Sequence, residues 1–191
     1  MDTRRSDSGT SRSVQVRLAK PDDAAMITTV INLAFRQVES FFVSEDRVDV
    51  ESVRNYLSSG LFLLAKSEGT ILGCVYVEPP LRNSDLSPAL PGAHAYLGLL
   101  AVDPAHQQSG LGSVLMDAAE DYCSGAGAAF VDIKVVSLRE ELFGFYRRRG
   151  YVETGTSPFP ADVETKLPCH FIDMSKVLNE SKKKALNESK E

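Results

Sequence analysis

Cysteine is scarce in this chain, and the few cysteines present are poorly spaced for the sites that they usually build. Cys74, Cys123 and Cys169 are the only three in 191 residues, and no C-x-x-C pair occurs. An odd number of widely separated cysteines argues against a disulfide framework and against a structural zinc site. We therefore expect no metal site, and we expect Cys74, which lies in an apolar run, to be a small core residue.

Long apolar runs and an excess of positive charge are also missing. No run approaches the length that a membrane-spanning helix needs, and residues 1–13 are polar, without the apolar core of a signal peptide. These features predict a cytoplasmic protein with no membrane partner. The net charge of −5 argues against nucleic acid as a partner, because proteins that bind nucleic acid usually carry a basic face. A cationic acceptor such as an amine is compatible with this charge.

The length and composition predict one globular domain between two polar tails. The chain has 191 residues, of which 43% are hydrophobic and 25% charged, the usual balance for a soluble domain with a substantial core. We expect a disordered tail over residues 1–13, a single domain over 14–177 and a polar tail over 178–191. Both a monomer and a homodimer are compatible with this organisation.

The apolar periodicities predict an α/β fold with the element order β-α-α-β-β-β-α-β-α-β-β. Strands are expected over 14–18, 61–65, 71–77, 95–102, 130–135, 151–154 and 169–174. Helices are expected from residue 21 to 34, between Asp49 and Gly60, from residue 111 to about 124, and over 139–149. Met26 is assigned to the buried apolar face of the first of these helices. Segments 35–49, 83–92 and 155–168 are expected to be loops.

The centre of the chain, residues 97–124, reads as a strand, a glycine-bearing polar loop and a helix. The helix is predicted from apolar residues at helical spacing: Leu111, Val114, Leu115, Ala118, Ala119 and Tyr122. A loop that opens into a helix presents free backbone N–H groups and positive potential, which favour an anion such as phosphate. The Walker pattern is excluded because Gly112-Ser113 lacks its lysine, and the dinucleotide fingerprint is excluded because Leu115 stands where its third glycine belongs.

Two motifs in this region resemble those of a known family. Gln107-Gln108-Ser109-Gly110-Leu111-Gly112, preceded by Val102-Asp103-Pro104, resembles the Q-x-x-G-x-G coenzyme A loop of the GNAT superfamily of acyl-CoA-dependent N-acetyltransferases. The stretch from residue 142 to 151, with its sequence FYRRRGY, resembles the later F-Y-x-x-x-G-[FY] motif of that family. The resemblance implies the GNAT fold: a mixed, mostly antiparallel sheet with two splayed parallel strands and flanking helices. It also implies acetyl-CoA as co-substrate.

The resemblance assigns roles to residues around the expected acetyl-CoA site. The pyrophosphate is expected at Gln107, Gln108, Ser109, Gly110, Leu111, Gly112 and Ser113, where glycines allow close approach to the backbone. The pantetheine amides are expected to pair with the backbone of Leu100 and Val102, between the two splayed strands. The N–H of Leu99 or Leu100 would stabilise the oxyanion, and Tyr146 would protonate the departing thiolate.

The acceptor site and the general base are less determined. The central strand carries no carboxylate, and Tyr96 and Gly98 occupy the positions where the family often has a glutamate. The remaining candidates for the base are Glu39, Glu45, His94 and His170. The candidates for acceptor binding are Phe35, Glu39, Phe42, Arg47, Tyr96 and His170, although core packing is the commoner role of such aromatic residues.

These acceptor candidates combine opposite charges, and both could serve one substrate. Glu39 could attract an amine, whereas Arg36 or Arg47 could hold an acceptor carboxylate through a bidentate pair. Arg139 departs from the family pattern, which frequently has asparagine seven positions before the tyrosine. We predict an N-acetyltransferase for a primary amine of a small or amino-acid-like molecule. The alternatives are a non-catalytic acyl-CoA-binding or sensing domain and a protein acetyltransferase for lysines or N-termini.

Overall fold

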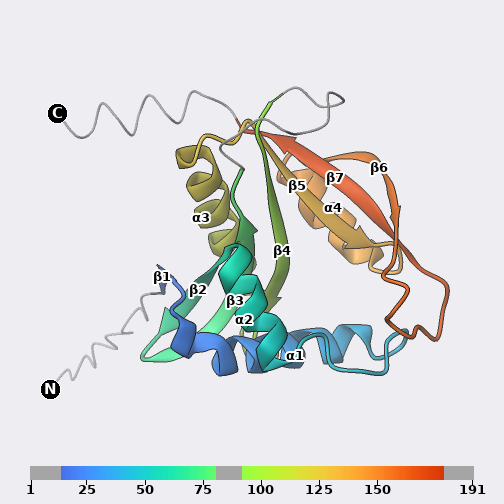
Figure 1. The fold of residues 1–191 in the computed structure, drawn as a ribbon, viewed down its shortest axis with the longest axis horizontal. Coiled ribbons are helices and arrows are strands. Elements are labelled where there is room, and N and C mark those ends of the chain that lie inside the picture. The colour runs from blue at the N-terminus through green and yellow to red at the C-terminus, as the bar shows by residue number, and fades with distance from the viewer. Residues whose placement is uncertain (1–13, 81–91, 179–191) are drawn as a thin grey trace, which may run out of the picture.

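The computed structural model describes residues 14–80 and 92–178, which form one seven-stranded sheet with helices on both faces (Figure 1). The strands lie in the order β1-β2-β3-β4-β5-β7-β6. Their bounds are β1 Gln15–Leu18, β2 Leu61–Ser67, β3 Thr70–Glu78, β4 His94–Val102, β5 Phe130–Val136, β6 Val152–Pro158 and β7 His170–Val177. The α-helices are α1 Ala24–Glu39, α2 Val50–Ser59, α3 Leu111–Gly125 and α4 Glu140–Arg148. Two short 3₁₀ helices, Pro21–Asp23 and Pro104–His106, precede α1 and follow β4.

The order of strands and α-helices predicted from the sequence is confirmed. The two predicted tails, apart from Leu178, and most of the loop predicted over 83–92 lie outside the described residues. In the part of the chain that is described, no helix is long and apolar enough to cross a membrane.

The sheet is antiparallel at every pairing except β4 with β5, which run parallel. β4 and β5 are paired only over four residues each, from the pair His94 and Phe130 to the pair Leu97 and Ile133. Both strands continue for several residues beyond this point. Figure 1 shows β4 and β5 side by side at the top and diverging downward, and α1 passes across the open end. The predicted mixed sheet with two splayed parallel strands is therefore confirmed.

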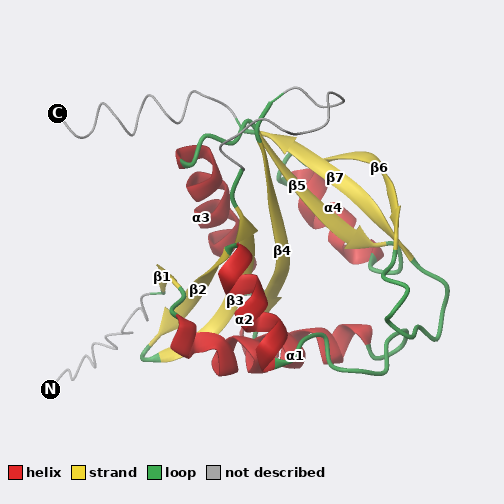
Figure 2. Ribbon diagram, in the orientation of Figure 1, coloured by secondary structure: helices red, strands yellow, loops and turns green. Residues whose placement is uncertain are grey.

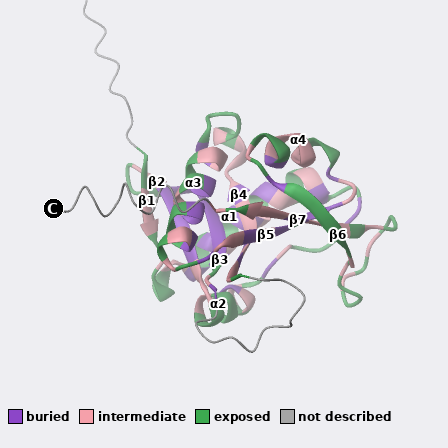
Figure 3. Ribbon diagram, turned by 90° about the horizontal axis from the view of Figure 1, so that it is seen from above, coloured by how far each residue is buried: buried purple, intermediate pink, exposed green. Residues whose placement is uncertain are grey.

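Two apolar clusters lie on opposite faces of the sheet. One cluster joins α3 and α4 to the sheet through residues such as Leu97, Leu115 and Ile133. The other joins α1 and α2 to β2–β4 through residues such as Ile27 and Phe62. In Figure 3 the buried residues gather between these layers, and the outer helix faces are exposed. Strand β3 is thus covered on both sides, which explains why its sequence is apolar from Ile71 to Val77.

Local signals in the sequence account for several element ends. Asp49 accepts a hydrogen bond from the Ser52 backbone N–H at 2.7 Å, which caps the start of α2, and Gly60 ends that helix. Glu68 and Gly69 both have positive φ, +48° and +90°, as the tight turn between β2 and β3 requires. The predicted cap, helix end and hairpin are confirmed.

Four local predictions were wrong. Strand β6 continues from Gly155 to Pro158, whereas a loop was expected from residue 155. Helix α1 continues through Phe35 to Glu39, whereas a loop was expected from residue 35. Met26, which was assigned to its apolar face, is 44% exposed. On α3, Val114 and Tyr122 point toward solvent, and the buried face consists instead of Leu111, Leu115, Met116, Ala119, Glu120 and Cys123. The spacing of apolar residues predicted a buried face of α3 that is rotated by about one residue, because a charged residue such as Glu120 was not expected on that face.

Candidate active site

The divergence of β4 and β5 opens a cleft in the middle of the sheet. The cleft contains a cavity of about 420 Å³, lined by residues of both strands, of α1 and of α4. One end of the cavity reaches Gln107 at the loop before α3, and the other reaches Glu39 at the end of α1. Beyond Leu97 on β4 and Ile133 on β5, the backbone groups that face the gap have no strand partner among the described residues. A ligand with amide groups can pair with them, much as an added strand does.

A β-bulge on β4 marks the middle of the cleft. Cys74 on β3 pairs with Ala101 and Tyr76 pairs with Gly98, so Val75 alone stands opposite Leu99 and Leu100. Leu99 has φ +48°, which is costly for a leucine and locally turns the backbone out of the regular ladder. The bulge therefore lies where the sequence predicted the oxyanion-stabilising N–H of Leu99 or Leu100. That role remains a prediction.

Glycine is required at position 98 because the Tyr96 side chain lies too close to its backbone to leave room for a Cβ atom. A Cβ atom at this position would lie 2.9 Å from the Tyr96 ring and 3.0 Å from its hydroxyl. The Tyr96 side chain therefore leans along β4 over Gly98, and both residues line the cavity. Burial raises the pKa of Tyr96 to about 12, so its hydroxyl stays protonated at neutral pH.

The loop between β4 and α3 is shaped to receive an anion. Asp103 accepts a hydrogen bond from the Ala105 backbone N–H and begins the short 3₁₀ turn that leads into the loop. Gln108 and Gly110 have φ +61° and +85°, and a Cβ atom on Gly110 would meet nothing within 4 Å. The backbone N–H groups of residues 108–113 donate no hydrogen bond to any described residue. Six free donors in an open loop at a helix N-terminus fit a pyrophosphate.

Gln107 links this loop to the cleft. Its side-chain amide lines the cavity and donates a long hydrogen bond of 3.4 Å to the carbonyl oxygen of Val102. Gly112 also leaves room, because a Cβ atom there would meet only the tip of Phe145 at 4.0 Å. The structure thus brings together all the residues predicted for the coenzyme A loop, and their binding roles remain predictions.

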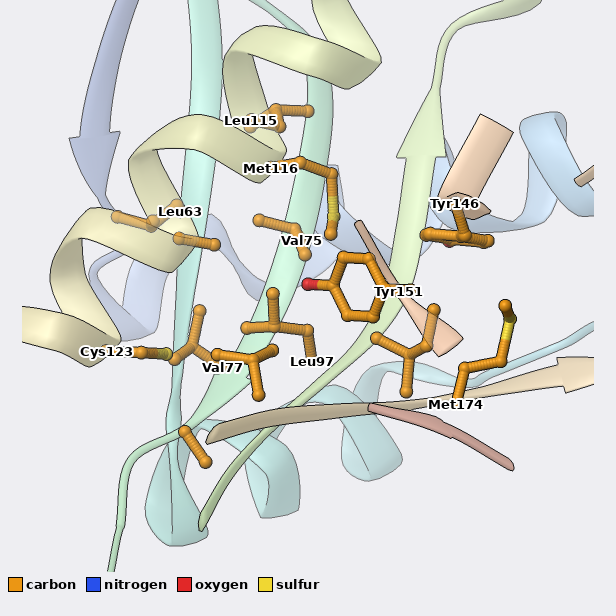
Figure 4. Packing of buried hydrophobic residues seen from close by; sticks show 14 of the residues in the cluster. Leu63, Val75, Val77, Leu97, Leu115, Met116, Cys123, Tyr146, Tyr151 and Met174 are labelled. Carbon is orange, nitrogen blue, oxygen red and sulfur yellow. The ribbon is translucent and has the colours of Figure 1, made fainter. Parts of the chain in front are cut away.

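Tyr146 lies on α4 and lines the cleft from the side of β5. Its ring packs edge-on against Phe145 and Tyr151, with centroids 5.1 and 5.7 Å apart, and both tyrosines belong to the core cluster shown in Figure 4. Its hydroxyl makes no hydrogen bond with the residues that the structure describes, so it is available to a ligand. Burial raises the pKa of Tyr146 to about 12, which keeps the phenol protonated, as a hydrogen-bond donor must be.

At the opposite end of the cleft, Glu39 is surrounded by two arginines. Its carboxylate is 4% exposed and lies 3.8 Å from the Arg47 guanidinium and 3.5 Å from that of Arg139. Burial raises the pKa of Glu39, and the two arginines oppose that rise. Arg139 also pairs with Glu141 at 2.5 Å. Glu39 therefore holds together α1, the segment after it and the start of α4.

Directly after Glu39, two segments that are far apart in the sequence contact each other. The Lys166 backbone N–H donates to the Phe42 carbonyl oxygen at 2.8 Å, and its ammonium donates to the Ser40 carbonyl oxygen at 2.8 Å. An isolated β-bridge joins Val43 to Thr165. Figure 2 shows these two loops, after α1 and after β6, side by side.

The predicted acceptor residues do not all reach the cavity. Phe35, Glu39, Arg47 and Tyr96 line it. Phe42 is fully buried in a separate cluster with Val43 and Val136, and His170 is exposed at the start of β7, outside the lining.

The remaining base and anchor candidates also lie elsewhere. His94 forms a 2.7 Å contact with Asp132 and stacks on Phe130, at the end where β4 and β5 are still paired. Arg36 and Asp46 pair with each other, and neither they nor Glu45 line the cleft. Lys134, Arg139 and Glu141 do line it, although they were not predicted to do so. Only the departure of Arg139 from the family pattern drew attention to any of the three.

Comparisons with known proteins agree with this geometry. The family model described as acetyltransferase (GNAT) family matches residues 29–151. A Salmonella typhimurium protein solved with its cofactor acetyl-CoA superposes with a TM-score of 0.66 at 20% identity, over 87% of this chain and 95% of that one. A ribosomal-protein-alanine N-acetyltransferase from Brucella melitensis gives 0.67 at 18% identity, over 86% and 99%.

A third structure, of a protein assigned as a phosphinothricin N-acetyltransferase, gives a TM-score of 0.66 at 19% identity, over 88% of this chain and 100% of that one. No curated protein matches the sequence. A protein assigned as a phosphinothricin N-acetyltransferase and a ribosomal-protein-alanine N-acetyltransferase are thus about equally similar in fold, and they do not distinguish between acceptors. The family match spans well over half of the chain, including the coenzyme A loop and Tyr146. The chain belongs to the GNAT family of acetyltransferases, and acetyl-CoA is its acetyl donor.

Proposed function

We propose that this acetyltransferase transfers the acetyl group to a primary amine of a small, amino-acid-like acceptor. The observation that carries the proposal is the limited volume of the cavity, whose lining includes the ion-paired Glu39 and Arg47. The cavity of about 420 Å³ is at the small end of the range for ligand pockets, and it must hold the pantetheine arm as well as the acceptor. A compact acceptor fits these dimensions.

In this proposal the donor is held at two places by the backbone. The free N–H groups of residues 108–113 bind the pyrophosphate, and the dipole of α3 favours its negative charge. The unpaired edge of β4 at Leu100 and Val102 pairs with the pantetheine amides. These contacts align the thioester with the bulge at Leu99, where the amine can attack at short range.

The chemical step then depends on two groups of the chain. As the amine nitrogen bonds to the thioester carbon, negative charge grows on the carbonyl oxygen, and the N–H of Leu99 or Leu100 stabilises it. The nitrogen gives its extra proton to water, the C–S bond breaks, and coenzyme A leaves as a thiolate, which takes up a proton after release. Tyr146 donates a hydrogen bond to this sulfur. The pKa of the Tyr146 phenol is about 12, whereas a thiol typically has a pKa of about 8.5. The phenol therefore stabilises the thiolate by a hydrogen bond more readily than it transfers its proton to the sulfur.

The acceptor must lose a proton before it attacks. No carboxylate of the described chain stands free in the cleft, because Glu39 is paired with two arginines and Glu141 with one. We propose that water takes this proton, so activity rises with pH until the amine is neutral.

The test is acetylation of a panel of small amines, amino acids and peptides, with thiol release and product mass measured together. Acetylation of small amines or amino acids with steady thiol release is expected. Acetylation of peptides alone would contradict the small-acceptor proposal. Tight binding of acetyl-CoA in calorimetry without turnover on any acceptor would favour the sensing domain instead.

A further inference from the structure

The charge in the cleft runs against the charge of the whole protein. The chain has a net charge of −5, yet among the residues that the structure describes, three cationic side chains and two carboxylates line the cavity. Lys134, Arg47 and Arg139 are the cations, and Glu39 and Glu141 are the acids. A cavity lining with an excess of positive charge is unexpected in an enzyme whose acceptor carries only an ammonium group, because like charges repel.

The charge of Arg139 is already balanced by two neighbouring carboxylates. Its guanidinium is paired with Glu141 at 2.5 Å and with Glu39 at 3.5 Å, and the residue is 9% exposed. It therefore has two acidic partners of its own.

Arg47 has fewer acidic partners than Arg139, and its side chain is more exposed. Its only ionic contact among the described residues is with Glu39 at 3.8 Å, and its guanidinium donates no hydrogen bond to any of them. It stacks near Phe35 and Phe159, 5.4 and 5.9 Å from the two ring centroids. Two rings and one carboxylate hold the planar group in a fixed place while its five N–H donors stay open. A guanidinium in this state matches a carboxylate in two parallel hydrogen bonds.

From these contacts we infer that Arg47 binds the carboxylate of the acceptor, and that the acceptor is an amino acid whose amine faces the bulge at Leu99. The inference rests on the proposed function and narrows its substrate class. Glu39 is a positioning residue in this arrangement, since its carboxylate is shared between Arg47 and Arg139 and is not open to the acceptor amine. The two aromatic rings exclude water from around Arg47, which strengthens a contact with an anion.

The experiment compares amino acids with the amines that remain after decarboxylation, for example phenylalanine with phenethylamine and histidine with histamine. We expect kcat/KM to be higher for amino acids than for the matched amines in the unaltered enzyme. Arg47→Gln is expected to lower kcat/KM for the best amino acid about 10- to 100-fold, mainly through KM, and to leave the matched amine unchanged. Arg47→Lys keeps the charge but not the fork, and an intermediate loss is expected.

Arg36→Gln is the matched control. It removes the same charge about ten residues away, from a side chain that is 68% exposed, pairs with Asp46 and lies outside the cleft lining. Both substrate classes should be unaffected, and the affinity for acetyl-CoA in calorimetry should be the same for all variants. A thermal unfolding curve for each variant shows that it is folded.

The outcomes separate this inference from the function on which it rests. If small amines are acetylated but the amine is preferred to its amino acid, or Arg47→Gln lowers both equally, the carboxylate site is refuted and the small-molecule activity stands. If only peptides are acetylated, the proposed function itself fails, and the inference fails with it.

Discussion

Replacing Glu120 by glutamine is expected to destabilise the protein more than any other single change of charge on α3. Glu120 is 5% exposed and accepts from Lys176 at 2.6 Å, Arg149 at 3.1 Å and the Tyr151 hydroxyl at 3.2 Å. It thereby joins α3 to the end of α4, the start of β6 and the last strand, β7. Burial, followed by the nearby Glu120, raises the pKa of Tyr151, so its hydroxyl remains a donor.

The size of the expected loss of stability depends on which contacts the partners of Glu120 keep in the glutamine variant. Removing one partner of a buried ion pair costs about 3–5 kcal/mol when the other charge is left buried. Here the cost is reduced because Arg149 keeps its contact with Asp117 at 2.7 Å and Lys176 has a side chain that is 23% exposed. We expect a loss of about 2–4 kcal/mol, which lowers Tm by roughly 5–15 °C in a domain of this size.

Urea and thermal unfolding followed by circular dichroism measure this loss. Asp117→Asn is the control, because it removes a charge that contacts the same arginine from a side chain that is 63% exposed. A change below about 1 kcal/mol is expected for this surface pair. Equal losses for the two variants would refute the view that burial of Glu120, and not charge alone, determines its contribution.

Three further predictions concern the donor site and the first strand. Gly110→Glu is expected to abolish acetyl-CoA binding in calorimetry, because the new side chain would place a negative charge in the anion site. The control is Gly127→Glu at the other end of α3, where φ is +95° and a Cβ atom would also meet nothing within 4 Å. This variant should bind acetyl-CoA normally. Tyr146→Phe should lower kcat about 10- to 1,000-fold at every pH while leaving acetyl-CoA affinity unchanged, and turnover near the unaltered rate would assign the role to another donor. Two hydrogen bonds from Arg17, at 2.7 and 2.8 Å, lower the pKa of Asp23 to about 2. Because this pKa is below its unfolded value, the stabilisation is present above about pH 4 and is lost as the pH falls toward 2. Asp23→Asn should therefore cost about 1–2 kcal/mol at pH 7 and nothing near pH 2; an equal cost at both values would refute this account.

Much of the fold could be predicted from the sequence because its signals are local. The strand before Asp103, the glycines of the coenzyme A loop and the helix after it follow each other directly, so their geometry depends on neighbouring residues. The same holds for the cap at Asp49 and the turn at Gly69. The family resemblance rested on two such local motifs, and the family match supports it.

The buried face of α3 shows where local patterns fail. Glu120 lies on that face because its partners arrive from 29 to 56 residues away. A carboxylate is excluded from an apolar face by its own chemistry, and only distant cations and a hydroxyl make the position stable. Periodicity therefore placed Val114 and Tyr122 inside and Glu120 outside, which is the reverse of the structure.

The sequence by itself thus determined the order of elements, the strand–loop–helix unit around Gly110 and the position of Tyr146 in a helix. The tertiary structure decided the rest of the cleft. The bulge at Leu99 depends on how β4 registers against β3, and the acceptor end depends on Glu39 meeting Arg139 across the open end of the sheet. Register and long-range ion pairs are set by the packing of the whole chain, so no window of sequence contains them.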